Sequence, residues 1–203
     1  SLFSPGIMSW YSFIPFMECY HGIVSANHSI EGKLEVNSKQ VNFDDGKGYL
    51  EKDWGTSFPE CWIWLQSNSF TKKDSSLFVS IAKIPWIGKF FIGFIAFIYL
   101  DGQFITFASY NHSALKKVKP EGNQLHIILE NRLYTLKIWA NTKNSGELIA
   151  PHNGTMTRRI KESIDSEVHY ELINKKTKEV VKDASSRAGL EIIEEIFNYL
   201  SKN

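Results

Sequence analysis

The sequence has few cysteines, and neither one is placed for a disulfide scaffold or a zinc site. Cys19 and Cys61 are the only two among 203 residues, too few for a small stapled fold. The six histidines show no paired spacing of the kind that metal sites use. We therefore expect no metal and no cofactor, and interpret both cysteines as free thiols buried in strands.

The sequence also lacks an excess of charge of either sign. It carries 23 basic and 22 acidic residues, which gives a formal net charge of +1. A nucleic-acid-binding domain is usually basic over a face or a stripe. We therefore expect no nucleic acid among the partners.

Long uninterrupted apolar runs are missing as well. Residues 84–100 (IPWIGKFFIGFIAFIYL) form the longest such stretch, but it has 17 residues and contains Pro85, Gly88, Lys89 and Gly93. A bilayer span needs about 20 mostly apolar residues. The run predicts two buried strands that meet near Gly88 and Lys89, and no integral membrane span. The first residues show no signal peptide, so we expect a cytoplasmic location, with peripheral attachment to a membrane as the open alternative.

What is abundant is aromatic side chains in strand-like segments. Aromatic residues make up 14% of the chain, and β-sheets accommodate them well. Turn signals such as Asn37-Ser38 and Asp101-Gly102 separate the segments. Strands are expected at residues 17–24, 29–36, 39–43, 48–54, 61–70, 76–83, 90–100, 103–110, 125–130, 133–139, 168–174 and 179–182.

Helical spacing occurs only at the end of the chain. Leu190, Ile193, Ile196, Phe197 and Leu200 follow a helical period and predict a helix over about 188–201 that packs on the sheet. Many short strands with one terminal helix indicate an all-β, antiparallel barrel or sandwich. We expect a single β-barrel domain over residues 1–203, and small barrels of this kind hold one small ligand inside.

Residues 46–70 (GKGYLEKDWGTSFPECWIWLQSNSF) carry the most informative pattern. In an extended strand, Trp62, Trp64, Gln66 and Asn68 share one face. Indoles mixed with amides are typical of a ligand pocket, although a solvent-facing sheet surface is an equally open interpretation. On the preceding strand Glu51 and Asp53 share a face and are the candidate carboxylates.

Two further clusters are candidates. Glu18 and His21 lie among apolar residues, where His21 is either a core histidine or a site residue; on a regular strand the two side chains point to opposite faces. Arg158 and Arg159 are followed by Glu162. They form either a solvated basic turn or a partner for the carboxylates that sets their charge state. No GxSxG, HExxH, P-loop or GxGxxG signature occurs in the right context.

Several of these runs resemble one known family. Residues 4–25 (SPGIMSWYSFIPFMECYHGIVS), residues 46–70, residues 150–163 (APHNGTMTRRIKES) and the run RAGLEII are similar, in the same order, to the tocopherol cyclase-like family. Its GxGYxxxxWG motif is similar to that of the carotenoid hydratase and AttH-like proteins. The resemblance implies a lipocalin-like, calycin-type β-barrel. It covers the C-terminal part of the family pattern, so we expect the family's N-terminal half to be absent from this chain.

The resemblance also implies a chemistry, namely closure of a prenylated hydroquinone to a chromanol. A carboxylic acid protonates an alkene and the phenol oxygen attacks the cation, so no cofactor is required. Its motif falls on Asp53, Glu51, Glu18 and His21, which are the candidate catalytic residues. Asp53, beside Trp54 and the two strand indoles, is the first candidate for the acid and Glu51 is the second. The motif also falls on the following candidate ligand-binding residues: Tyr49, Trp54, Trp62, Trp64, Gln66, Asn68, Arg158, Arg159 and Glu162.

Three functional hypotheses stay open at this point. The first is a cofactor-independent cyclase acting on a hydrophobic small molecule such as a prenyl quinol. The second is a non-catalytic protein that binds a lipid, isoprenoid or quinone in the same pocket. The third is a structural part of a larger protein, for which we expect a homodimer or association with the missing N-terminal half.

Overall fold

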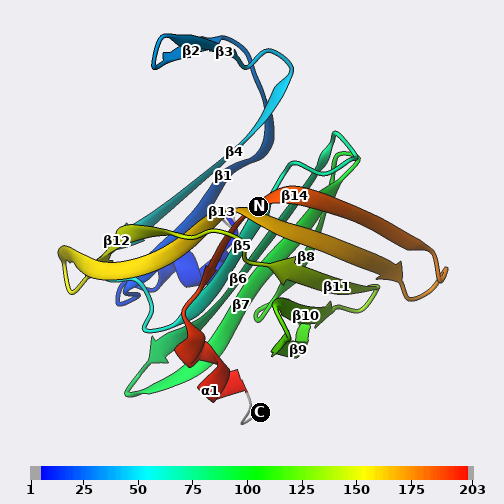
Figure 1. Ribbon diagram of the computed structural model, residues 1–203. Coiled ribbons are helices and arrows are strands. Elements are labelled where there is room, and N and C mark those ends of the chain that lie inside the picture. The colour runs from blue at the N-terminus through cyan, green and yellow to red at the C-terminus, as the bar shows by residue number, and fades with distance from the viewer. Residues whose placement is uncertain (1–5, 201–203) are drawn as a thin grey trace.

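The computed structural model describes residues 6–200 (Figure 1). Every strand pairing is antiparallel. The first half contains a short helix η1 (Ser9–Phe13) and strands β1 (Cys19–Ile30), β2 (Lys33–Val36), β3 (Lys39–Asn42), β4 (Gly46–Gly55), β5 (Trp62–Ser67), β6 (Ser75–Trp86) and β7 (Lys89–Leu100). The second half contains β8 (Gln103–Ala108), β9 (Ala114–Glu121), β10 (Gln124–Glu130), β11 (Tyr134–Asn141), β12 (Gly146–His152), β13 (Thr155–Asn174), β14 (Val180–Ile192), η2 (Glu194–Ile196) and α1 (Phe197–Leu200).

Most of the strands belong to one ten-stranded sheet. Its order is β8-β7-β6-β5-β14-β13-β11-β10-β9, with β12 paired to β13. Strands β1 and β4 form a separate two-stranded ribbon, and β2 and β3 form a second one that extends away from the large sheet (Figure 1). The all-β, antiparallel class predicted from the sequence is confirmed.

The expected closed barrel is wrong. In the part of the chain that the structure describes, β8 and β9 end the sheet and do not pair with each other. The sheet is nevertheless curved, because Phe107 of β8 and Ile127 of β10 belong to one buried core. Strands β1 and β4 pair with each other instead of joining the large sheet, so they supply no strands to close it.

The turn signals are confirmed. Asn37 and Ser38 both have positive φ angles, 51° and 61°, and connect β2 to β3. Asp101 and Gly102 do the same between β7 and β8, with φ angles of 49° and 81°. Two-residue turns of this kind match the twist of antiparallel strands. Residues 84–100 contribute to two long strands, β6 and β7, as expected. Among the described residues, no helix is long and apolar enough to span a membrane.

The predicted C-terminal helix is mostly wrong. Residues up to Ile192 belong to β14, which pairs with both β5 and β13, and helical structure begins only at Glu194. Pairing on both sides overrides the helical spacing, because an interior strand satisfies its backbone groups through two neighbours. The last predicted positions do pack on the core, with Ile196 fully buried and Phe197 and Leu200 beside it.

Candidate functional site

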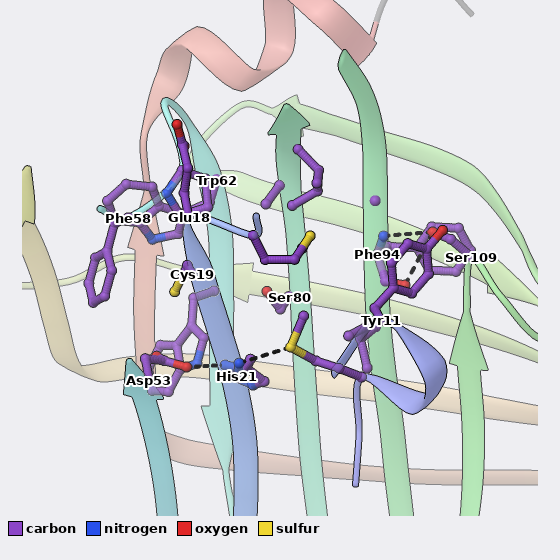
Figure 2. Close-up of a pocket in the computed structure, with 18 of the residues that line it drawn as sticks. Tyr11, Glu18, Cys19, His21, Asp53, Phe58, Trp62, Ser80, Phe94 and Ser109 are labelled. Carbon is purple, nitrogen blue, oxygen red and sulfur yellow. Dashed lines mark hydrogen bonds and ion pairs between the residues drawn. The ribbon is translucent and has the colours of Figure 1, made fainter. Parts of the chain in front are cut away.

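A cavity of about 360 Å³ lies between the β1–β4 ribbon and one face of the large sheet (Figure 2). That volume is in the range of small-molecule sites. Strand alternation separates this face from the core. Ile63 and Leu65 of β5 are fully buried in the core, whereas Trp62 and Trp64 line the cavity. The cavity therefore lies outside the main core and not within it.

Apolar and aromatic side chains form most of the cavity wall. They come from the N-terminal segment, the loop before β5 and strands β6 and β7. The main ones are Met8, Tyr11, Met17, Phe58, Ile84, Phe91 and Phe94. Polar side chains line the rest of the cavity, and they include Glu18, His21, Glu51, Asp53, Ser80, Glu162 and Glu191. A largely apolar cavity with a few grouped polar residues is typical of a site for a hydrophobic ligand.

Strand pairing explains how the ribbon presents its polar residues. His21 of β1 lies opposite Asp53 of β4, and Ile23 lies opposite Glu51. Residues two apart on a strand share a face, so Glu51 and Asp53 both point into the cavity, as the sequence predicts. Trp54 follows Asp53 directly and therefore points the other way.

Glu51 receives several hydrogen bonds. Its carboxylate accepts from the Tyr49 hydroxyl and from the Trp64 indole nitrogen, at 3.0 Å in the latter case. His21 Nδ1 lies 3.1 Å from Oε1 of Glu51. Burial raises the pKa of Glu51 to about 7, although His21 and the hydrogen bond from Tyr49 oppose the increase. Near neutral pH, Glu51 therefore populates both its protonated and its ionised form.

His21 and Asp53 form a second polar contact beside Glu51, drawn in Figure 2. Burial alone would lower the pKa of His21, but the hydrogen bond to Asp53 and the charge of Glu51 outweigh it and raise the pKa. The Asp53 side chain is 27% exposed, compared with 10% for Glu51. Asp53 is thus the more solvated carboxylate and is already bound to an imidazole.

Donor atoms of His21, Glu51 and Asp53 lie within 4.8 Å of one another, close enough to share a cation. Histidine spacing along the chain does not reveal such a group, because the fold assembles it from two strands. In the structure the imidazole contacts both carboxylates directly. These contacts raise the pKa of His21, so a metal ion at this position would compete with a proton for the imidazole.

Glu191 is the residue that the sequence analysis missed. It accepts a hydrogen bond of 2.5 Å from the Trp62 indole nitrogen and lines the cavity. Burial raises its pKa to about 7; the bond from Trp62 lowers it, and the charges of Glu162, Asp53 and Glu51 raise it. The run Ala188-Gly189-Leu190-Glu191 alternates between buried apolar residues and cavity-facing ones, a strand signal that the helical spacing concealed.

Gly189 allows the Trp64 ring to pack closely against β14. A Cβ atom at this position would approach the Trp64 ring to 2.7 Å, closer than real Cβ atoms come to another group. Gly189 pairs with Gln66 of β5 and directly precedes Leu190. Its lack of a side chain leaves room for the indole beside Glu191.

Several predicted ligand residues lie outside the cavity. Trp54 stacks on Tyr20 at 5.6 Å and is 47% exposed. Asn68 donates to the carbonyl of Lys47, and Gln66 is not among the cavity residues. Tyr49 also does not line the cavity, but its hydroxyl group donates a hydrogen bond to the Glu51 carboxylate.

The two adjacent arginines have different surroundings: Arg158 packs beside the cavity residue Trp62, and Arg159 lies at the surface. Arg158 donates to the carbonyl oxygens of Pro59 and Glu60 at 2.7 Å and 2.6 Å, and its guanidinium lies 4.8 Å from the Trp62 ring centre. Arg159 points to solvent and pairs with Glu147. Neither arginine forms an ion pair with Glu18, Glu51 or Asp53 among the salt bridges of the described residues.

Glu18 and Glu162 both line the cavity. Glu18 lies just before β1, outside regular strand structure, which is why it shares the cavity with His21. Burial raises the pKa of Glu162, whose strand position lies opposite Glu191. The site therefore gathers carboxyl groups from β4, β13 and β14.

The fold and the site define an antiparallel β protein with a carboxyl-containing hydrophobic cavity. Residues 4–193 match the tocopherol cyclase-like family, so the chain belongs to that family. The chain is 26% identical over 196 residues to the tocopherol cyclase, chloroplastic, of Zea mays, a match that covers 90% of this chain and 41% of the maize protein. It is also 26% identical over 141 residues to a probable tocopherol cyclase, chloroplastic, of Oryza sativa subsp. japonica, covering 68% of this chain and 30% of that protein.

The chain thus spans less than half the length of these relatives. Among solved structures, kievitone hydratase from Nectria haematococca matches with a TM-score of 0.48 and 12% identity. That match covers 86% of this chain and 53% of the hydratase.

Proposed function

We propose that the cavity binds a hydrophobic prenyl quinol or related isoprenoid and promotes acid-catalysed ring closure onto its alkene. The observation that carries this proposal is the pair Glu51 and Glu191, two carboxyl groups with pKa values of about 7 in an aromatic-walled cavity. A general acid works best when its pKa lies near the working pH. A site that only binds an apolar ligand does not need such groups.

The hydrogen bonds assign different roles to the two carboxyl groups. Glu51 faces three donors, from Tyr49, Trp64 and His21, and donors favour the ionised form. Glu191 has one donor, from Trp62. Glu191 is therefore the proton donor and Glu51 is the carboxylate. This assignment replaces the first choice from the sequence, Asp53, because Asp53 is more exposed and engaged with His21.

The alkene π electrons take the proton of Glu191, which forms a C–H bond and leaves a tertiary carbocation and a Glu191 carboxylate. A lone pair of the phenol oxygen forms the C–O bond, and the phenol proton passes to Glu51. Return of that proton from Glu51 to Glu191 restores the starting state. The faces of Trp62 and Trp64 stabilise the cation by cation–π attraction.

The test is a ring-closure assay on a prenyl hydroquinone with the wild-type chain, Glu191→Gln and Glu51→Gln. We expect each variant to lose at least about 100-fold in kcat/KM, the usual contribution of a positioned acid or base. Wild-type kcat/KM should be highest near pH 7, because Glu191 ionises above that pH and Glu51 becomes protonated below it. Asp53→Asn serves as the control, with a smaller expected loss.

Two results would contradict the proposal. If Glu191→Gln and Glu51→Gln turn over as fast as wild type while Asp53→Asn is inactive, the acid is Asp53. If the wild-type chain retains an isoprenoid in native mass spectrometry but never converts it, the site only binds its ligand.

A further inference from the structure

A cluster of apolar side chains, all exposed except the half-buried Trp86, lies beside the cavity and has no role in the site. It combines residues of the N-terminal segment with the turn between β6 and β7. We call it the aromatic tip, and it consists of Trp10, Phe13, Phe16, Trp86, Ile87 and Phe90. Phe13 is 68% exposed and Ile87 is 77% exposed. The ring centre of Trp86 lies 6.5 Å from that of Trp10 and 5.7 Å from that of Phe16, so these three rings are in contact, and Ile87 directly follows Trp86 in the chain.

Ile87 has a backbone conformation that does not suit its side chain. Its φ angle is 43°, in the left-handed region, where a β-branched residue is a genuine outlier. The residue forms the turn at the end of the β6–β7 hairpin (Figure 1). Glycine, asparagine or aspartate would fit this position better and would not expose an apolar side chain. An exposed and strained isoleucine contributes little to folding, which indicates a contact outside the chain.

The charge pattern of the two segments fits a lipid surface. Residues 6–17 contain no charged residue, and residues 84–100 contain only Lys89. Lys89 is exposed beside Ile87. Lys83 also lies here, 4.7 Å from the Phe90 ring centre, where it pairs with Glu60. Tryptophan with phenylalanine at one level and lysine beside them is the pattern of side chains that enter the interface of a membrane.

The same segments also line the cavity. Tyr11 of η1, Pro85 of β6 and Phe91 of β7 are cavity residues. Tyr11 contacts Trp86 with ring centres 6.0 Å apart, so the cavity wall continues into the aromatic tip. A ligand that leaves a bilayer at the tip would therefore meet the aromatic rings of Trp86 and Tyr11 on its way to the cavity.

We propose that the aromatic tip inserts into the surface of a lipid bilayer that contains anionic lipids, with Ile87 and Phe13 entering the apolar region and Lys89 contacting the headgroups. This inference concerns where the chain docks and does not depend on whether the cavity is catalytic. It is tested by binding alone, so its failure and the failure of the ring-closure proposal are separate results.

The experiment is co-sedimentation of the full chain with vesicles of phosphatidylcholine alone and of phosphatidylcholine mixed with phosphatidylglycerol. We expect binding to the mixed vesicles that weakens with added salt, because exposed charges are screened. Ile87→Asn should reduce the partition coefficient at least about tenfold, as expected when one large apolar side chain no longer enters the lipid. Phe13→Ser should have a similar effect.

Ile164→Asn is the matched control, because Ile164 is also 77% exposed but lies on β13, outside the aromatic tip. It should bind like wild type. Ile87→Asn relieves the left-handed strain, so its melting temperature should not fall. Loss of binding in a variant that folds at least as well cannot come from unfolding.

Three outcomes would overturn the proposal. Wild-type protein that stays in the supernatant with both kinds of vesicle excludes the bilayer. Equal binding by Ile87→Asn and wild type excludes the aromatic tip. A stable dimer in size-exclusion chromatography that Ile87→Asn dissociates, without vesicle binding, would identify a second copy of the chain as the occupant.

Discussion

The two faces of strand β5 show how one short segment supports both stability and a site. Cys61, just before the strand, and Ile63 and Leu65 point into the core and are fully buried. Trp62 and Trp64 point into the cavity and donate their indole N–H groups to Glu191 and Glu51. The core face is apolar up to Leu65 and ends in the buried, hydrogen-bonded Ser67, whereas the cavity face pairs both indoles with a carboxyl group. Removing a core side chain of β5 should therefore lower stability at every pH, whereas replacing the carboxyl group that Trp62 contacts should raise stability at alkaline pH.

The largest expected effect is on the core face. Leu65→Ala should lower the free energy of unfolding by about 2–5 kcal/mol, because it removes buried methyl groups and leaves a cavity. Denaturant unfolding monitored by tryptophan fluorescence measures the change. A loss below about 1 kcal/mol would mean that β5 is not the boundary of the core.

On the cavity face, Glu191→Gln should make the protein more stable at pH 8 by up to about 3 kcal/mol. The pKa of this carboxyl group is 4.5 unperturbed and about 7 when folded. Between these values the unfolded chain has lost a proton that the folded chain still holds, so stability decreases as pH rises. Glutamine does not titrate and avoids this loss. The difference between the proteins should disappear below about pH 4.5, and a constant difference at all pH values would contradict the explanation.

A smaller effect is expected when the indole donor is removed. Trp62→Phe keeps an aromatic ring next to Arg158 but leaves Glu191 without its hydrogen bond. Because that bond lowers the pKa of Glu191, the pKa should rise further. Stability at pH 8 should fall by about 1–3 kcal/mol, the cost of leaving a buried acceptor unsatisfied. Phe58→Leu, at another cavity position, is the control and should not move the pKa.

The smallest expected change in the free energy of unfolding is for Arg159, and it distinguishes this residue from its neighbour Arg158. Arg159→Ala should change the free energy of unfolding by less than about 0.5 kcal/mol, because its pair with Glu147 is exposed. Arg158→Ala should cost more, about 1–2 kcal/mol, since two carbonyl oxygens and the Trp62 ring lose their partner. Equal values from thermal denaturation would contradict this division of roles.

Local patterns predicted a large part of this molecule. The alternation of β5, the turns at Asn37 and Asp101 and the shared face of Glu51 and Asp53 all follow from residues that are close in sequence. These features depend on a two-residue period and on turn chemistry. The family match over residues 4–193 includes the runs of sequence on which the resemblance was based.

Features that depend on distant pairing were not predictable in this way. Glu191 was assigned to a helix because its apolar neighbours also fit a 3.6-residue period, and only pairing with β5 and β13 makes it a strand residue. The sequence predicts Trp54 as a pocket residue, but the strand period turns it away from Asp53 and onto Tyr20, so the period is better evidence than the residue type. The separation of the β1–β4 ribbon from the main sheet is likewise a property of the whole fold.

The central claim is that the cavity-facing carboxyl groups of Glu51 and Glu191 both titrate near neutral pH, so that one can donate a proton while the other accepts one. Carbon-detected NMR titration of side-chain carboxyl groups, assigned with Glu51→Gln and Glu191→Gln, measures this directly. We predict midpoints of about 7 for both groups. Midpoints near 4.5, the unperturbed value, would contradict the account, because neither group would then be an acid at neutral pH.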